Sequence, residues 1–69
     1  MLTFYLDGPE FIELHKLLKV TGLCQSGGMA KTLIGNGCVR VDGVIERRKR
    51  CKIYPGQIVS FNEHHIRVT

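Results

Sequence analysis

Hydrophobic residues follow a helical period in the first half of this chain and an alternating, strand-like period after Gly37. The segment Leu2–Leu6 has the aromatic and aliphatic content of a short strand, and two amphipathic segments with helical spacing follow it. The second half predicts several short strands that turn back on one another. This order predicts an α+β fold, in which a helical hairpin packs on a small antiparallel β-sheet.

The first amphipathic segment predicts a helix that begins near Pro9 and ends at Gly22. Asp7 or Gly8 is the expected cap, and proline suits the first turn because amide protons there have no partner within the helix. The apolar stripe of this helix repeats at helical spacing and comprises Phe11, Leu14, Leu17 and Leu18.

The second predicted helix begins at Ser26, whose hydroxyl can accept a free amide proton of the first turn. Its expected inward-facing stripe comprises Met29, Ala30, Leu33 and Ile34. The sequence GNG at Gly35–Gly37 ends this helix, because glycine and asparagine tolerate the left-handed backbone of a helix terminus. The glycine-containing turn between the two segments joins them as a helical hairpin.

A β-hairpin is predicted directly after the second helix. Val39 and Val41 alternate with Arg40, so the two valines share one face of a strand. The pair Asp42–Gly43 is a strong hairpin signal, because both central positions of such a turn need a positive φ angle. The returning strand is expected to end or bend at Glu46, since its register would place this side chain on the valine face.

The rest of the chain predicts a turn and two more strands. Tyr54–Gln57 has proline followed by glycine at its centre, which is typical of a type II turn. The segments Ile58–Phe61 and Ile66–Thr69 are predicted strands, with a polar turn at Asn62–His64 between them.

Half of the lysines and arginines, five of ten, lie in one run of six positions, Arg47–Lys52. We call this run the basic loop, and its cations are Arg47, Arg48, Lys49, Arg50 and Lys52. Since the net charge of the chain is +4, all other residues together carry −1. Localised positive charge attracts phosphate and suits nucleic acid or an anionic membrane, although a merely solvated loop has the same composition. The predicted hairpin and turn on either side should hold these cations in nearly fixed places.

The reactive side chains form no catalytic or metal-binding pattern. Cys24, Cys38 and Cys51 are odd in number and include no Cys-x-x-Cys pair, which favours three reduced thiols over zinc or disulfides. The three histidines and six acidic residues show no spacing typical of acid–base catalysis. We therefore expect no enzymatic activity, no cofactor and no metal.

Length and hydropathy predict a single, soluble domain, residues 1–69, and the three reduced thiols predict that it is cytoplasmic. Sixty-nine residues leave no room for a second core. The N-terminal segment lacks a basic leader, and the longest apolar runs are far shorter than a membrane span.

The start of the second helix is a second candidate for phosphate binding. Free amide protons and the positive end of the helix dipole lie beside Ser26, Gly27 and Gly28, and glycine lets a phosphate backbone approach closely. Lys31 lies one turn further along the helix. An ordinary cap with flexible glycines is the alternative interpretation.

These segments resemble a known family. The stretch GLCQSGGMAKTLIGNGCVRVDG, followed by YPGQIVSF, is similar to the RNA-binding domain first described in ribosomal small-subunit protein S-four. The resemblance covers about residues 11 to 61, and the chain resembles the small, free-standing bacterial members of that family. The matching positions are Ser26, Ala30, Leu33, Ile34, Gly37, Val39, Val41, Gly43, Pro55 and Gly56.

The resemblance implies an alpha-L RNA-binding motif, in which the two helices and the following loops grip folded RNA. Where many members have arginine and serine, this chain has Gly27 and Gly28; Asp42 replaces the usual asparagine, and Gln57 replaces an aspartate. The candidate RNA-binding residues are Ser26, Gly27, Gly28, Lys31, Thr32, Arg40, Arg47, Arg48, Lys49, Arg50 and Lys52.

The sequence thus predicts a monomeric protein that binds structured RNA, ribosomal or another stable RNA, through one face. That face should join the start of the second helix to the basic loop. Two alternatives remain open. A DNA-binding helix-turn-helix protein is disfavoured because glycines and one lysine occupy the second helix where base-reading side chains are expected. A module that binds an acidic protein partner would have the same charge distribution.

Overall fold

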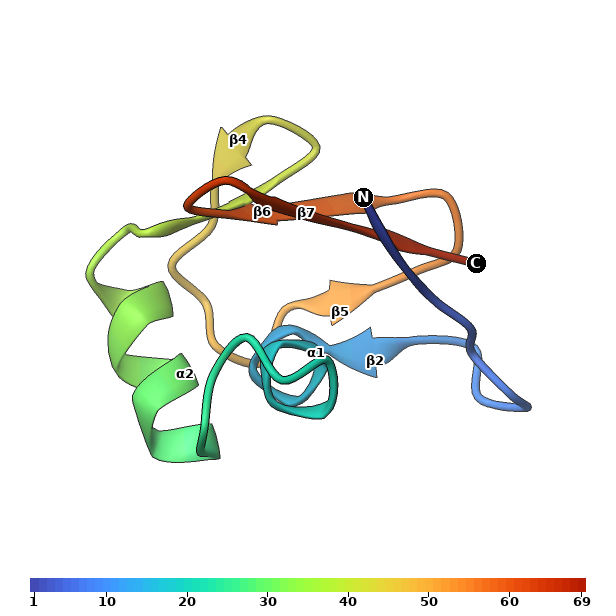
Figure 1. Ribbon diagram of the computed structural model, residues 1–69, viewed down its shortest axis with the longest axis horizontal. Helices are drawn as coiled ribbons and strands as arrows, with labels where there is room; N and C mark the ends of the chain where they lie inside the picture. Colours follow the sequence, from blue (N-terminus) through green and yellow to red (C-terminus); the bar gives the residue numbers. More distant parts are fainter.

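The computed structural model describes residues 1–69 and contains two helices, a five-stranded sheet and a two-stranded sheet (Figure 1). In chain order the elements are β1 (Leu2–Phe4), β2 (Ile12–Glu13), α1 (Leu14–Val20), α2 (Gly27–Gly35), β3 (Val39–Val41), β4 (Val44–Ile45), β5 (Lys52–Ile53), β6 (Ile58–Phe61) and β7 (His64–Val68). The larger sheet has the order β1-β7-β6-β3-β4, and β2 pairs with β5. The predicted α+β fold is confirmed. The larger sheet is mixed rather than wholly antiparallel, because β1 runs parallel to β7.

Both helices lie on one side of the larger sheet, and the core fills the space between them (Figure 1). In β6 and β7 every second residue points inward, as the alternating pattern predicts. Burial of each large aliphatic side chain contributes about 1.5–3 kcal/mol relative to exposure. The core comprises Leu14, Leu17, Leu18, Cys24, Ala30, Ile34, Val39, Ile53, Val59, Phe61, Ile66 and Val68.

Helix α1 begins five residues later than the sequence predicts. Pro9 and Phe11 lie outside the helix, and Ile12–Glu13 form β2, which pairs with Lys52–Ile53. The prediction of a cap at Asp7 or Gly8 was wrong because the free amide groups of α1 find acceptors far away in the sequence, in the basic loop. The predicted end is confirmed, since α1 stops at Val20, shortly before Gly22, which has a φ of 81°.

Helix α2 agrees with the sequence at both ends. The amide of Met29 donates to the Ser26 hydroxyl oxygen at 3.1 Å, and Gly37 takes the left-handed conformation beyond the helix. The prediction that Met29 belongs to the inward-facing stripe was wrong, because its side chain is 46% exposed. Residues of a helix are about 100° apart around its axis. Met29 therefore lies on the opposite side of Ala30 from Ile34 and turns away from the core.

Both predicted tight turns are present. Asp42 and Gly43 have φ angles of 50° and 84°, so the hairpin turn has the two positive values that it requires. Gly56 has a φ of 95° in the predicted proline-glycine turn. Strand β4 ends at Ile45, just before Glu46. Neither helix has the length and apolar character needed to cross a lipid bilayer.

Candidate nucleic-acid interface

The basic loop (Arg47–Lys52) is fixed by main-chain hydrogen bonds to the start of α1. Leu14 N–H donates to the Cys51 carbonyl oxygen at 2.9 Å, and His15 N–H donates to the Lys49 carbonyl oxygen at 3.1 Å. The first amide groups of a helix have no partner within it, so the loop serves as the cap of α1. Within the loop, Cys51 N–H donates to the Arg48 carbonyl oxygen at 3.1 Å. The loop is thus an ordered segment, as its place between two turns predicts.

Arg47 connects the loop to the other end of the helical hairpin. Its Nη1 donates to the carbonyl oxygen of Gly35, the last residue of α2, at 3.3 Å. Its guanidinium lies over Gly37, where an added Cβ would stand 2.9 Å from Nη2. A cation near the C-terminus of a helix is favoured by the helix dipole. Arg47 therefore holds the loop against α2, and the absence of a side chain at Gly37 leaves room for its guanidinium.

An open groove of about 620 Å³ lies between α2 and the basic loop. Five of its lining residues are cations, and none is acidic or hydrophobic. The α2 side contributes positions three and four residues apart, which share one face of a helix. Figure 1 shows the loop running from β4 to β5 between α2 and α1. The groove is lined by Lys31, Thr32, Gly35, Arg47, Arg48, Lys49 and Arg50.

A second depression, of about 410 Å³, continues the positive surface toward β5. Its lining residues are Arg48, Arg50, Cys51 and Lys52. Since Arg48 and Arg50 line both hollows, the cationic surface is continuous from the middle of α2 to Lys52.

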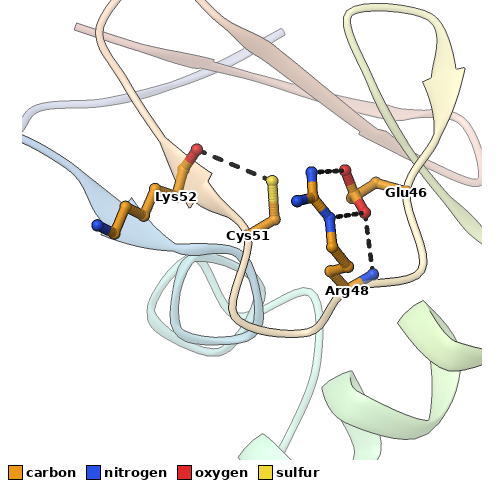
Figure 2. A network of polar contacts seen from close by, with 4 residues as sticks. All are labelled: Glu46, Arg48, Cys51 and Lys52. Carbon is orange, nitrogen blue, oxygen red and sulfur yellow. Dashed lines mark hydrogen bonds and ion pairs between the residues drawn. The ribbon is translucent and has the colours of Figure 1, made fainter.

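Arg48 is neutralised within the loop by Glu46 (Figure 2). Its Nε donates to Glu46 Oε2 at 3.0 Å, its Nη2 donates to Oε1 at 3.0 Å, and its backbone N–H donates to Oε2 at 3.0 Å. These hydrogen bonds lower the pKa of Glu46 to about 2 and raise the pKa of Arg48. The pair fixes the loop's conformation but reduces the positive charge that Arg48 offers to a ligand.

The cations of this surface therefore differ in their freedom. Lys31, Lys49 and Arg50 have no hydrogen bond or ion pair from their side chains to the protein, so their charges face solvent. Arg47 and Arg48 are held in place by Gly35 and Glu46. The surface thus has three cations that are free to bind a ligand, and two arginines that stabilise the conformation of the loop.

Cys51 lies inside this network without reactive character. Burial, followed by the negative charge of Glu46, raises the pKa of its thiol, and a protonated thiol is a poor nucleophile. Its Sγ lies 3.8 Å from the Lys52 carbonyl oxygen (Figure 2). All three cysteines are free. No three His, Cys, Asp or Glu side chains lie close enough together to hold a metal ion.

The structure brings together most, but not all, of the residues that the sequence singles out. Six of them line the groove, and Lys52 lines the adjacent depression. The remaining candidates lie outside both hollows. Ser26 caps α2, and Arg40 Nη1 donates to the Gly43 carbonyl oxygen at 3.3 Å. Gly27 and Gly28 stand in the first turn of α2, where the Gly28 carbonyl oxygen accepts a hydrogen bond from Thr32. The loop thus faces the middle and end of α2 rather than its first turn.

Two parts of this surface were missed by sequence reasoning. Gly35 follows Lys31 and Thr32 at helical spacing, so the period of α2 contains the signal for it. The contact of Arg47 with Gly35 joins residues 12 positions apart, before and after the β3–β4 hairpin, and no local pattern indicates it.

Comparison with known proteins agrees with the fold. A family model described as the S4 domain matches residues 4–69. YbcJ of Escherichia coli (strain K12), which carries a provisional name as an RNA-binding protein, is 50% identical over 68 residues, covering 99% of this chain and 97% of YbcJ. YbcJ of Shigella flexneri matches with the same identity and coverage.

A solved structure gives the same result. The solution structure of YbcJ from E. coli has a TM-score of 0.77 and 49% sequence identity, and the match covers 100% of this chain and 87% of that one. It is described as revealing an alpha-L motif involved in RNA binding. The resemblance inferred from the motifs is therefore confirmed and extends beyond residues 11 to 61. The chain belongs to the S4 domain family.

Proposed function

We propose that this protein binds structured RNA and that the ribose-phosphate backbone lies in the groove between α2 and the basic loop. The observation that carries this proposal is the lining of the groove, with five cations and no acidic or hydrophobic residue. The description of the 49% identical YbcJ structure as having a motif involved in RNA binding supports the same ligand class.

The chemistry of the groove suits phosphate more than base edges. Arg50 offers a planar fork that can pair with two phosphate oxygens, while Lys31 and Lys49 act as mobile point charges. Double-helical RNA is recognised mainly by its shape, phosphates and 2′-hydroxyls. Because main-chain bonds already fix the loop, little backbone entropy is lost when RNA binds.

In the cell, the protein acts as a monomer in the cytoplasm on ribosomal or another stable RNA. It carries out no catalytic step. Three free thiols are consistent with a reducing compartment.

The salt dependence of RNA affinity tests the proposal. About four phosphate contacts give a slope of log affinity against log salt near −3. The triple variant Lys31→Ala/Lys49→Ala/Arg50→Ala removes the three free cations and should bring this slope close to −1. A matched control, Lys16→Ala/Lys19→Ala/Arg67→Ala, removes the same charge from exposed residues that line neither hollow.

The two variants must behave differently if the groove holds RNA. Equal losses of affinity and slope would mean that only the net charge of the protein matters. A DNA hairpin of the same sequence provides a further comparison, and tighter binding to DNA than to RNA would favour the helix-turn-helix alternative. An acidic protein captured equally well after nuclease treatment would favour the protein-interaction alternative.

A further inference from the structure

Next to the cationic surface lies an aromatic pair that phosphate binding does not use. The ring centroids of Phe11 and Tyr54 are 5.7 Å apart with an interplanar angle of 47°. Lys52 Nζ stands 4.9 Å from the centroid of the Phe11 ring. Tyr54 is 44% exposed although it is a large aromatic residue, so one ring of the pair is open to a ligand.

The pair is held on a rigid support. Phe11 immediately precedes β2 and Tyr54 immediately follows β5, and these two strands pair through Ile12 and Ile53. Tyr54 also begins the proline-glycine turn, where its N–H donates to Gln57 Oε1 at 2.8 Å and its carbonyl oxygen accepts from Gln57 N–H at 3.2 Å. The backbone that carries both rings is therefore fixed before any ligand arrives.

Lys52 connects this aromatic pair to the groove. It lines the second depression together with Arg48 and Arg50, which also line the groove beside α2. Its ammonium group reaches the ring of Phe11 at the other end. The cationic surface thus extends from α2 to the aromatic pair. No acidic side chain lines either hollow.

A base pair inside a duplex has both faces covered by its neighbours and cannot stack on a side chain, whereas an unpaired base can. Every base has an apolar face that stacks on an aromatic ring, and cations beside such rings hold the backbone of single strands. We propose that Tyr54, supported by Phe11, stacks on an unpaired RNA base. The preferred ligand is then a duplex that continues into a single strand. This inference rests on the proposed RNA binding and adds the class of RNA.

Three hairpin RNAs of equal stem test this inference. The first RNA is blunt, the second has a 3′ overhang of two nucleotides, and the third has the same overhang at its 5′ end. In both overhangs the first unpaired base is 2-aminopurine. We expect the wild-type protein to bind one of the overhang RNAs about tenfold more tightly than the blunt RNA, which corresponds to about 1.4 kcal/mol. Stacking should also quench the 2-aminopurine fluorescence of that complex.

Tyr54→Ala should remove both the preference and the quenching, while Tyr54→Phe should keep both. Tyr5→Ala is the matched control, because Tyr5 is 71% exposed and belongs to neither the aromatic pair nor a hollow. Equal affinity of the wild-type protein for all three RNAs, or a preference that survives in Tyr54→Ala, overturns this inference and leaves the proposed function standing. Failure to bind any of the RNAs overturns both.

Discussion

Asp42 and Gln57, which both depart from the residues usual in the family, touch each other. Gln57 Nε2 donates to Asp42 Oδ2 at 3.3 Å, and the other carboxylate oxygen accepts from the Ile58 N–H at 2.9 Å. The family pattern has an amide on the hairpin and a carboxylate after the proline-glycine turn, whereas this chain has the reverse. The two departures are therefore one exchange of hydrogen-bonding roles between neighbouring turns.

This exchange predicts strong coupling between positions 42 and 57. Asp42→Asn would bring two amide groups together, and Gln57→Asp would bring two carboxylates together. Each single variant should lower the free energy of unfolding by about 1 kcal/mol. The double variant restores one donor and one acceptor, so a urea-denaturation cycle should give a coupling free energy of about 2 kcal/mol.

The backbone does not confound this cycle. Asp42 has a φ of 50°, a conformation that asparagine also tolerates. The bond from Tyr54 N–H to Gln57 Oε1 changes in the same way in both backgrounds and cancels. Purely additive effects would show that the contact between the two side chains contributes nothing to stability.

Gly37→Ala tests whether the guanidinium of Arg47 packs against Gly37. The alanine would have to adopt a φ of 79° and would place its Cβ 2.9 Å from the guanidinium. The left-handed conformation alone costs about 1–2 kcal/mol, so we expect a loss of at least that size in urea unfolding. Removing Arg47 as well should make the double variant less destabilised than the sum of the singles, because the steric contact is then absent.

Gly35→Ala is the matched control for this substitution. Position 35 lies within α2, has no positive φ, and has no atom within 4 Å of an added Cβ. Alanine there should stabilise the helix by about 0.5–1 kcal/mol. A similar loss of stability in Gly35→Ala would contradict the contrast between the two positions. Purely additive effects of Gly37→Ala and the removal of Arg47 would show that the guanidinium makes no steric contact at Gly37.

The contrast between the two helices shows which structural features the sequence can predict. The signals that bound α2 are local, because Ser26 accepts from an amide three residues away and Gly37 needs only its own backbone freedom. The start of α1 depends on the carbonyl oxygens of Lys49 and Cys51, more than thirty residues away. The local signals therefore favour a helix start near Pro9, although α1 begins at Leu14.

The candidate site divides in the same way. The number of cations in the basic loop is visible in the sequence, and so is its position between two turns. Which cations of the loop are bound and which are free depends on Glu46 and on the end of α2. Only folding brings the end of α2 close to the loop. The hydrophobic periodicity predicted the helical hairpin, and the family resemblance implied that this hairpin and the following loops form one face. It did not indicate that the loop would meet α2 at Gly35.

The ion pair of Glu46 with Arg48 predicts a change of stability in acid. The pKa of Glu46 is lowered from 4.5 to about 2 by the hydrogen bonds from Arg48. A carboxylate whose pKa is lower in the folded state stabilises the protein above its unfolded pKa. This contribution is fully present above about pH 4.5 and is lost as the pH falls toward 2.

Glu46→Gln measures that contribution. The difference in unfolding free energy between wild type and variant should be largest at neutral pH and should disappear near pH 2. Glu63→Gln is the control, because Glu63 is exposed and forms no ion pair, and it should show no such pH dependence. A difference between wild type and Glu46→Gln that stays constant from pH 7 to pH 2 would contradict the assignment.

The last prediction separates the two tasks that Ser26 could have, capping α2 and contacting RNA. Its hydroxyl oxygen already accepts from Met29 N–H, and its side chain lines neither hollow. Ser26→Ala should therefore lower the free energy of unfolding by about 1 kcal/mol and leave the affinity for a hairpin RNA within twofold of wild type. Ser26→Asn restores a good cap and should recover the stability. If instead Ser26→Ala weakens RNA binding tenfold in a protein that is still folded, the RNA reaches the first turn of α2, and the binding face is larger than the groove.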